Sequence, residues 1–140
     1  MRVEFMGLKE AEKIKPDNTL ALISISNEMS IKNLSPDWDN ILELEFDDVD
    51  QDVFTYTTFN SQMAKQVITF IQTLPETVEC VVVHCWAGVS RSAAIAKFLA
   101  LYYDSYFPKD YGLYNKLVYS TLLKTYNQLQ EKGEINIDKN

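Results

Sequence analysis

The only histidine of the chain and one of its two arginines flank a short loop that contains a cysteine. The loop reads HCWAGVSRS from His84 to Ser92, and it directly follows the β-branched run VECVVV. Backbone amides of such a tight loop, at the start of a helix, form a concave site for a tetrahedral anion. The guanidinium of Arg91 matches two phosphate oxygens. The sequence therefore predicts a phosphate-binding loop with the thiol of Cys85 at its base.

A thiol in this position can act as a nucleophile. The amides and the guanidinium around Cys85 favour thiolate over thiol and lower its pKa. A thiolate beneath a bound phosphate is placed for in-line attack on phosphorus. The hydroxyl of Ser92 could donate to the sulfur and make it a better leaving group in a second step. We expect His84 to brace the loop through backbone hydrogen bonds, and Gly88 to adopt a positive φ where the loop turns.

The stretch from His84 to Ser92 resembles the His-Cys-x5-Arg-Ser/Thr loop of the cysteine-dependent protein-tyrosine phosphatases. It is most similar to the small dual-specificity branch of that superfamily and to its microbial tyrosine-phosphatase-like relatives. The similarity extends to the stretches ALISIS, LELEFDDVD and YNKLVYSTLL, and so covers most of the chain. A structural cysteine and a surface arginine at a helix start are the alternatives without chemistry.

The resemblance implies a role for each residue of the loop. Cys85 matches the nucleophile that forms a phosphocysteine intermediate. Arg91 matches the residue that holds phosphate in the ground state and the transition state. The phosphate is bound by backbone amides at Trp86, Ala87, Gly88, Val89, Ser90 and Arg91, and His84 and Ser92 support the loop.

The same resemblance requires an aspartic acid on a separate upstream loop, which protonates the leaving oxygen and later activates water. The run DDVDQD offers four candidates, at positions 47, 48, 50 and 52. The alternation of Leu44 and Phe46 leads to Asp48, which is therefore our choice, and Asp47 and Asp50 remain open. A solvated acidic turn would explain this run without chemistry.

The elements that must position these residues follow from hydrophobic periodicity. Apolar patterns predict strands at 3–5, 19–26, 41–46 and 78–84, and helices near 8–14, 59–74, 90–103 and 114–131. The strand at 78–84 is apolar on both faces and is expected at the centre of the sheet, whereas 41–46 alternates and is expected nearer an edge. Thr57 and Thr58 are expected to cap the helix at 59–74. The pattern predicts an α/β domain with a central, mostly parallel sheet flanked by helices.

Composition limits the size and the partners of the protein. With 140 residues, of which 46% are hydrophobic, residues 1–140 are expected to form one domain, with a frayed tail at about 132–140. The net charge of −7 argues against nucleic acid or an anionic membrane as the main partner. No apolar stretch approaches the ~20 residues that span a bilayer, and the charged N-terminus does not resemble a signal peptide. We expect a soluble, cytoplasmic protein.

The two cysteines of the chain are too few for a disulfide framework. Cys80 and Cys85 fall on one predicted strand, where their Cα atoms would be ~16 Å apart and beyond disulfide reach. A single histidine with so few thiols argues against a structural zinc site. We therefore expect no metal and no organic cofactor.

These observations predict a single-domain phosphatase that hydrolyses phosphotyrosine in proteins or peptides, and they leave phosphoserine and phosphothreonine open. The loop should also bind phosphate, sulfate and vanadate. No lysine lies between Cys85 and Arg91, which counts against phosphoinositide or polyphosphate-RNA substrates. One alternative is a catalytically inactive phosphate-binding module. The other is a different thiol enzyme, a sulfurtransferase or an arsenate reductase, of which the reductase would need a second cysteine within reach.

Overall fold

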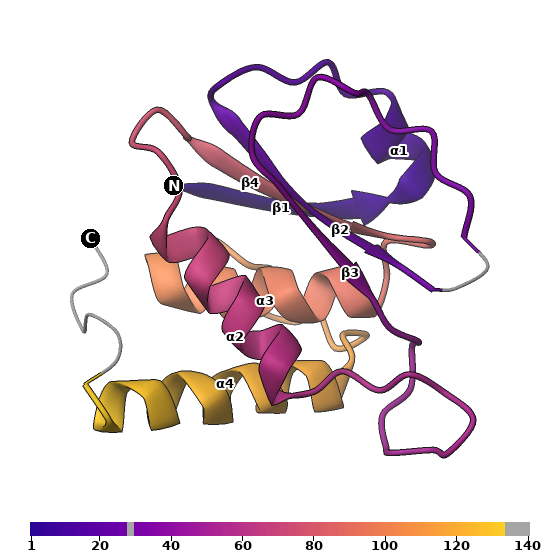
Figure 1. Cartoon of the computed structure of the whole chain (residues 1–140), viewed down its shortest axis with the longest axis vertical. Helices are drawn as coiled ribbons and strands as arrows, with labels where there is room; N and C mark the ends of the chain where they lie inside the picture. Colours follow the sequence, from indigo (N-terminus) through magenta and orange to yellow (C-terminus); the bar gives the residue numbers. More distant parts are fainter. Residues whose placement is uncertain (28–29, 134–140) are drawn as a thin grey trace.

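The computed structural model describes residues 1–27 and 30–133. A sheet of four parallel strands lies at the centre of this structure (Figure 1). The strands are β1 (Arg2–Gly7), β2 (Leu20–Ser26), β3 (Ile41–Glu45) and β4 (Cys80–Cys85). They lie in the order β1-β4-β2-β3, and every pairing is parallel. The predicted fold class is therefore confirmed, with β4 in the interior and β3 at an edge.

Strand β4 is buried along its whole length because it lies between β1 and β2. Successive side chains of a strand point to opposite faces of the sheet. Accordingly, Val81, Val83 and Cys85 belong to the larger apolar cluster, whereas Cys80 and Val82 belong to the smaller one. The two cysteines thus face opposite sides of the sheet.

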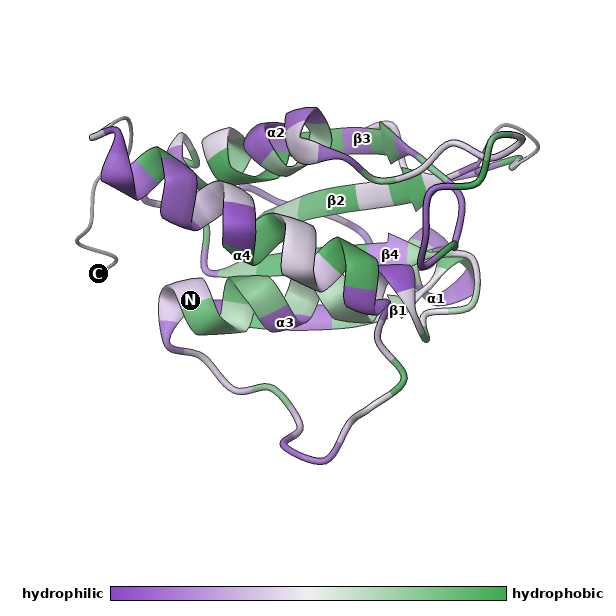
Figure 2. Cartoon of the chain, turned by 90° about the horizontal axis from the view of Figure 1, so that it is seen from below, coloured by the Kyte–Doolittle hydropathy of each residue, from purple (hydrophilic) through white to green (hydrophobic). Residues whose placement is uncertain are grey.

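Helices cover both faces of the sheet. Helix α1 (Leu8–Glu12) lies on one face, and α2 (Ser61–Gln72), α3 (Arg91–Tyr103) and α4 (Lys116–Glu131) lie on the other (Figure 1). In Figure 2, α3 is largely green, whereas α4 alternates between purple and green. This difference reflects their positions, because α3 packs against β1, β4 and α4 and is buried nearly all round. The predicted apolar stripe of α4 is buried, at Val118, Leu122, Tyr126 and Leu129.

The helix ends differ from the predicted ones. Helix α2 is capped by Asn60, whose side-chain oxygen accepts from the Met63 amide at 3.0 Å, and not by Thr57 or Thr58. The backbone of Thr57 instead donates to the side chain of Asp47. The expected frayed tail falls mostly at 134–140, outside the described residues.

The described residues bear on three further expectations. Within 1–27 and 30–133, each helix is too short or too polar to cross a lipid bilayer. In the same part of the chain, no group of three or more His, Cys, Asp or Glu side chains is arranged to hold a metal ion. Cys80 and Cys85 are both free, and their placement on opposite faces of one strand excludes a disulfide between them.

Candidate active site

The cysteine-containing loop lies between the carboxyl end of β4 and the start of α3. Strand β4 ends at Cys85 and α3 begins at Arg91, so the loop comprises residues 86–90. In open parallel sheets this end of the strands is where ligands bind. The N-terminus of α3 also directs its free N–H groups and its positive dipole end toward the loop.

A close approach of two backbones shapes the loop. Gly88 has a φ of +75°, and a Cβ atom there would lie 2.3 Å from the backbone nitrogen of Gly7. Only glycine fits at this contact, where the loop meets the end of β1. Two hydrogen bonds hold the corner: Leu8 N donates to Trp86 O at 3.1 Å, and Gly7 N donates to the Glu10 side chain at 3.2 Å.

Cys85 is buried at the base of this loop. The Gly88 amide donates to its sulfur at 3.3 Å, and the hydroxyl oxygen of Ser92 lies 3.1 Å from the same sulfur. Burial opposes ionisation of the thiol. Hydrogen bonds from Ser92 and Gly88, together with the charge of Arg91, outweigh burial and lower the pKa of Cys85 below its ordinary value. The surroundings therefore favour a thiolate.

Arg91 joins this loop to the segment that carries the candidate acids. Its side chain is buried, with 6% of the residue exposed, and Nη1 donates to the carbonyl oxygen of Phe46 at 2.8 Å. Among the described residues, no carboxylate lies within ion-pair distance of the guanidinium. The positive charge of Arg91 is thus not neutralised by a described acidic side chain.

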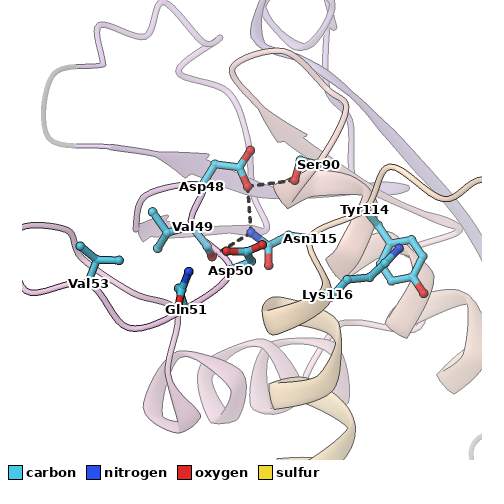
Figure 3. Close-up of a pocket in the computed structure, with 9 residues that line it drawn as sticks. All are labelled: Asp48, Val49, Asp50, Gln51, Val53, Ser90, Tyr114, Asn115 and Lys116. Atoms are coloured by element: carbon cyan, nitrogen blue, oxygen red, sulfur yellow. Dashed lines mark hydrogen bonds between the residues drawn. The ribbon is translucent and has the colours of Figure 1, made fainter.

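The four candidate aspartates have different environments. The Oδ1 atom of Asp48 accepts from the hydroxyl of Ser90 at 2.9 Å and from Nδ2 of Asn115 at 2.8 Å (Figure 3). The carboxylate of Asp47 instead accepts from the Thr57 amide at 2.8 Å and closes the base of its own loop. Of the four, Asp48 is therefore the one that the structure links to the loop at 86–90, through Ser90.

The remaining two carboxylates do not contact the loop in the described hydrogen bonds. Asp52 accepts from the Thr58 hydroxyl at 3.3 Å, and Asp50 is exposed. Asp50 lines a surface pocket of about 410 Å³ beside Asp48, together with Val49, Gln51, Val53, Ser90, Tyr114, Asn115 and Lys116 (Figure 3). This pocket adjoins the candidate acid on the side of α4.

His84 is buried and braces the strand end. Its Nδ1 lies 3.2 Å from Cys85 O, and its Nε2 lies 2.6 Å from the hydroxyl oxygen of Ser24 on β2. Burial lowers the pKa of His84, so the ring is neutral at pH 7. A neutral ring that donates from Nδ1 to the carbonyl must accept at Nε2 from Ser24. Ser24 in turn accepts from Lys32 Nζ at 3.0 Å, so Lys32 completes this chain of hydrogen bonds.

The segment between α3 and α4 contributes residues that the sequence analysis did not assign. The Tyr111 hydroxyl donates to Val89 O at 2.6 Å and supports the loop from outside. Burial, followed by the nearby Cys85 thiolate, raises the pKa of Tyr111, which keeps it a donor. Asn115 has a local signal, because an asparagine before the apolar run KLVYSTLL is a helix N-cap pattern. Gly7 and Tyr111 have no such signal.

Two side chains of the loop point away from the site. Trp86 is 63% exposed and Val89 is 40% exposed. Their backbone groups remain in the loop, where Trp86 O and Val89 O accept the hydrogen bonds from Leu8 and Tyr111. The loop thus presents backbone toward its centre and apolar side chains at its rim.

Comparisons with known proteins give structural matches. No protein-family model matches the sequence, and no curated protein matches it. Among solved structures, PTPMT1 in complex with PI(5)P superposes with a TM-score of 0.52 and 16% identity over 81% of each chain. A mouse protein described as a dual-specificity phosphatase, solved with zinc tungstate, gives a TM-score of 0.46 and 16% identity over 86% of this chain and 78% of that one. The likeness to PTPMT1 confirms the expected architecture: this chain shares the α/β fold of that structure, with a central parallel sheet flanked by helices.

Proposed function

We propose that the protein is a cysteine-dependent phosphatase that hydrolyses phosphotyrosine in proteins or peptides through a phosphocysteine intermediate. One observation supports this above the others. The sulfur of Cys85 lies at the base of a loop at a helix N-terminus, with donors from Gly88 and Ser92 and with the charge of Arg91 nearby. These surroundings suit a thiolate that lies beneath a bound phosphoryl group.

In the first step, the Cys85 thiolate attacks phosphorus. The S–P bond forms while the bond between phosphorus and the leaving oxygen breaks, and the protonated carboxyl of Asp48 gives its proton to that oxygen. The loop amides and Arg91 neutralise the charge on the three remaining phosphoryl oxygens, which is the main catalytic effect in phosphoryl transfer. The product of this step is phosphocysteine and a free phenol.

In the second step, water attacks the phosphocysteine. The Asp48 carboxylate takes one proton from the water, whose oxygen bonds to phosphorus as the S–P bond breaks. Cys85 leaves as a thiolate, which the Ser92 hydroxyl 3.1 Å away stabilises by donating to the sulfur. Inorganic phosphate is released and the enzyme returns to its starting state.

Charge around the site favours a substrate with one phosphate over a polyanionic headgroup. Residues 86–90 include no lysine or arginine, and the neighbouring run at 47–52 carries four aspartates. PTPMT1, which shares the fold, is described in complex with PI(5)P. In this chain, the excess of negative charge would repel a second phosphate on the same ligand. A protein or peptide phosphotyrosine fits these constraints better than a phosphoinositide.

The competing arsenate reductase chemistry lacks a second sulfur within reach. Cys80 belongs to the apolar cluster on the opposite face of the sheet from Cys85. Burial, followed by the charge of Glu4 and a hydrogen bond to it, raises the pKa of Cys80 to about 11. Such a thiol cannot resolve an intermediate on Cys85, which counts against an arsenate reductase. Two free thiols also suit a reducing compartment, and we place the protein in the cytoplasm.

The test is turnover together with the capture of the intermediate. Wild-type protein is incubated with a phosphotyrosine peptide in EDTA, and a rapidly acid-quenched sample is analysed by mass spectrometry. We expect phosphate release and one phosphoryl group on the peptide fragment that contains Cys85. Phosphate binding without turnover would instead indicate an inactive binding module. Turnover that requires added Mg²⁺ or Zn²⁺ would contradict the thiolate mechanism.

A further inference from the structure

Asn115 connects three parts of the molecule that lie far apart in the sequence. Its Oδ1 accepts from the Val118 amide at 3.0 Å and so caps helix α4. Its backbone amide donates to Ser90 O at 3.0 Å, at the end of the phosphate-binding loop. Its Nδ2 donates to Oδ1 of Asp48 at 2.8 Å and to the carbonyl oxygen of Val49 at 3.0 Å. Only 5% of the residue is exposed.

These contacts determine how the Asp48 carboxylate is oriented. Both of its side-chain donors, Ser90 and Asn115, bind the same oxygen, Oδ1 (Figure 3). No described hydrogen bond involves the second oxygen, Oδ2, which is therefore the one able to exchange a proton with a substrate. One donor comes from the phosphate-binding loop and the other from the start of α4.

The segment that carries Asp48 has few other attachments. Residues 50–57 are exposed, and Phe54 is fully exposed. Little apolar burial holds this segment in place, and such segments open at low free energy. Its position near the site depends on the hydrogen bond from Arg91 to Phe46 O and on the pairing of Asp47 with Thr57. It depends also on the hydrogen bonds that Ser90 and Asn115 donate to Asp48 and Val49.

The contacts of Asn115 restrict which amino acid can occupy position 115. A helix cap alone is served as well by Asp, Ser or Thr. Asp has no donor, and Ser or Thr has a single oxygen for both bonds, so among the good capping residues only Asn caps α4 with one atom and donates to Asp48 with another. Glutamine is one carbon longer and would not fit the same distances.

We propose that Asn115 is a positioning residue for the general acid, which holds Asp48 so that Oδ2 faces the leaving oxygen. The proposal rests on the proposed phosphatase function and on Asp48 as its acid. The N-cap residue of α4 would then orient the carboxyl group that transfers the proton, although Asn115 itself touches neither the substrate nor the phosphoryl group.

The decisive variant is Asn115→Asp. It keeps an oxygen to accept from the Val118 amide, so the helix cap survives. A second carboxylate oxygen replaces the nitrogen that donates to Asp48 and to Val49 O. Asn60→Asp is the matched control, because Asn60 caps α2 in the same way by accepting from Met63 N at 3.0 Å. Asn60 makes no described hydrogen bond to the acid-bearing segment. Equal thermal unfolding of the two variants would verify that both caps hold.

The measurement is kcat/KM with phenyl phosphate and with 4-nitrophenyl phosphate. Phenol is a strong base, like tyrosine with its pKa of ~10, and needs a proton as it leaves, whereas nitrophenol barely does. In Asn115→Asp we expect a loss of about 10- to 10²-fold on phenyl phosphate and less than about threefold on the nitrophenyl ester. Asn60→Asp should change neither.

A double-mutant cycle separates positioning from general damage. Asn115→Asp should add little to the loss already caused by Asp48→Asn, since its effect passes through that side chain. Equal losses on both substrates, or full additivity with Asp48→Asn, would overturn the proposal while wild-type turnover leaves the phosphatase function standing. An inactive wild-type protein would overturn the phosphatase function, and the positioning role with it.

Discussion

The guanidinium of Arg91 donates from Nη1 to the carbonyl oxygen of Phe46 at 2.8 Å. Phe46 immediately precedes the aspartate run, so the arginine expected to bind phosphate also holds the base of the segment that carries Asp48. The candidate phosphate-binding loop is therefore joined to the segment that carries Asp48 by the side chain of Arg91. A change at Arg91 should disturb both anion binding and proton transfer.

Arg91→Lys keeps the charge but provides one ammonium group in place of a planar fork. The lysine cannot bond to Phe46 O and also grip two phosphate oxygens. We expect kcat to fall by about 10²-fold or more, with weaker inhibition by vanadate and sulfate. Arg2→Lys is the matched control, because Arg2 is exposed and pairs with Glu4 away from the loop. Near wild-type activity in Arg91→Lys would remove the fork from the mechanism.

Cys85→Ser should abolish turnover while substrate still binds, because an alcohol is far less acidic than a thiol but fits the same loop. Cys80→Ser should keep turnover and lower the free energy of unfolding by about 1–3 kcal/mol, since it buries a hydroxyl. The checks are phosphate release, substrate binding by calorimetry, and urea unfolding. Retention of a tenth of the wild-type rate in Cys85→Ser, without metal, would exclude covalent catalysis.

The lowered pKa of Cys85 makes its reactivity depend on pH in a defined direction. As pH increases, the thiolate fraction of Cys85 and its rate of alkylation by iodoacetate should both increase. The midpoint of this increase should lie at a lower pH than for a free thiol, whose pKa is ~8.5. Ser92→Ala removes a hydrogen bond that lowers this pKa and should move the midpoint to higher pH. Bound phosphate should protect the sulfur. A wild-type midpoint near that of a free thiol would contradict the electrostatics of the loop.

Asp48→Asn should slow hydrolysis of tyrosyl phosphate by about 10²- to 10⁴-fold and should slow phosphocysteine formation from an activated aryl ester far less. Asp50→Asn should do neither, because Asp50 is exposed and makes no described contact with the loop. Burst rates with both substrates are the measurement. The same leaving-group dependence in Asp47→Asn or Asp50→Asn would move the acid to that position.

Gly88→Ala tests the shape of the loop. A Cβ atom at a φ of +75°, 2.3 Å from Gly7 N, forces the loop away from β1. We expect a loss of about 1–3 kcal/mol in the free energy of unfolding, together with loss of activity. Gly112→Ala should change neither, because a Cβ there would meet no atom within 4 Å. Urea unfolding and kcat measure both effects, and an active, fully stable Gly88→Ala would show that the loop tolerates a different path.

Much of the fold is readable in local patterns. The run VECVVV is β-branched or apolar at every position but Glu79, and its last four residues begin the buried interior strand β4. The alternating ILELE is the edge strand β3. Periodicity reports how many faces of an element are buried, so these positions in the sheet were predictable. The cap of α2 was not, because Thr57 pairs with Asp47, ten residues away, and leaves Asn60 to cap the helix.

The candidate site likewise has residues that local sequence patterns predict and residues that depend on contacts between distant parts of the chain. The sequence by itself determined Cys85, Arg91 and the loop between them, because a strand, a tight turn and a helix start are consecutive in the chain and their geometry is local. Among the four aspartates it favoured Asp48, from the alternation of Leu44 and Phe46, but it left Asp47 and Asp50 open and did not link Asn115 to any of them. Only the tertiary structure shows which aspartate contacts the loop, since the hydrogen bonds of Asp48 with Ser90 and Asn115 join residues 42 and 67 positions apart. Such contacts depend on how α4 packs against α2 and α3, and no local pattern encodes that packing.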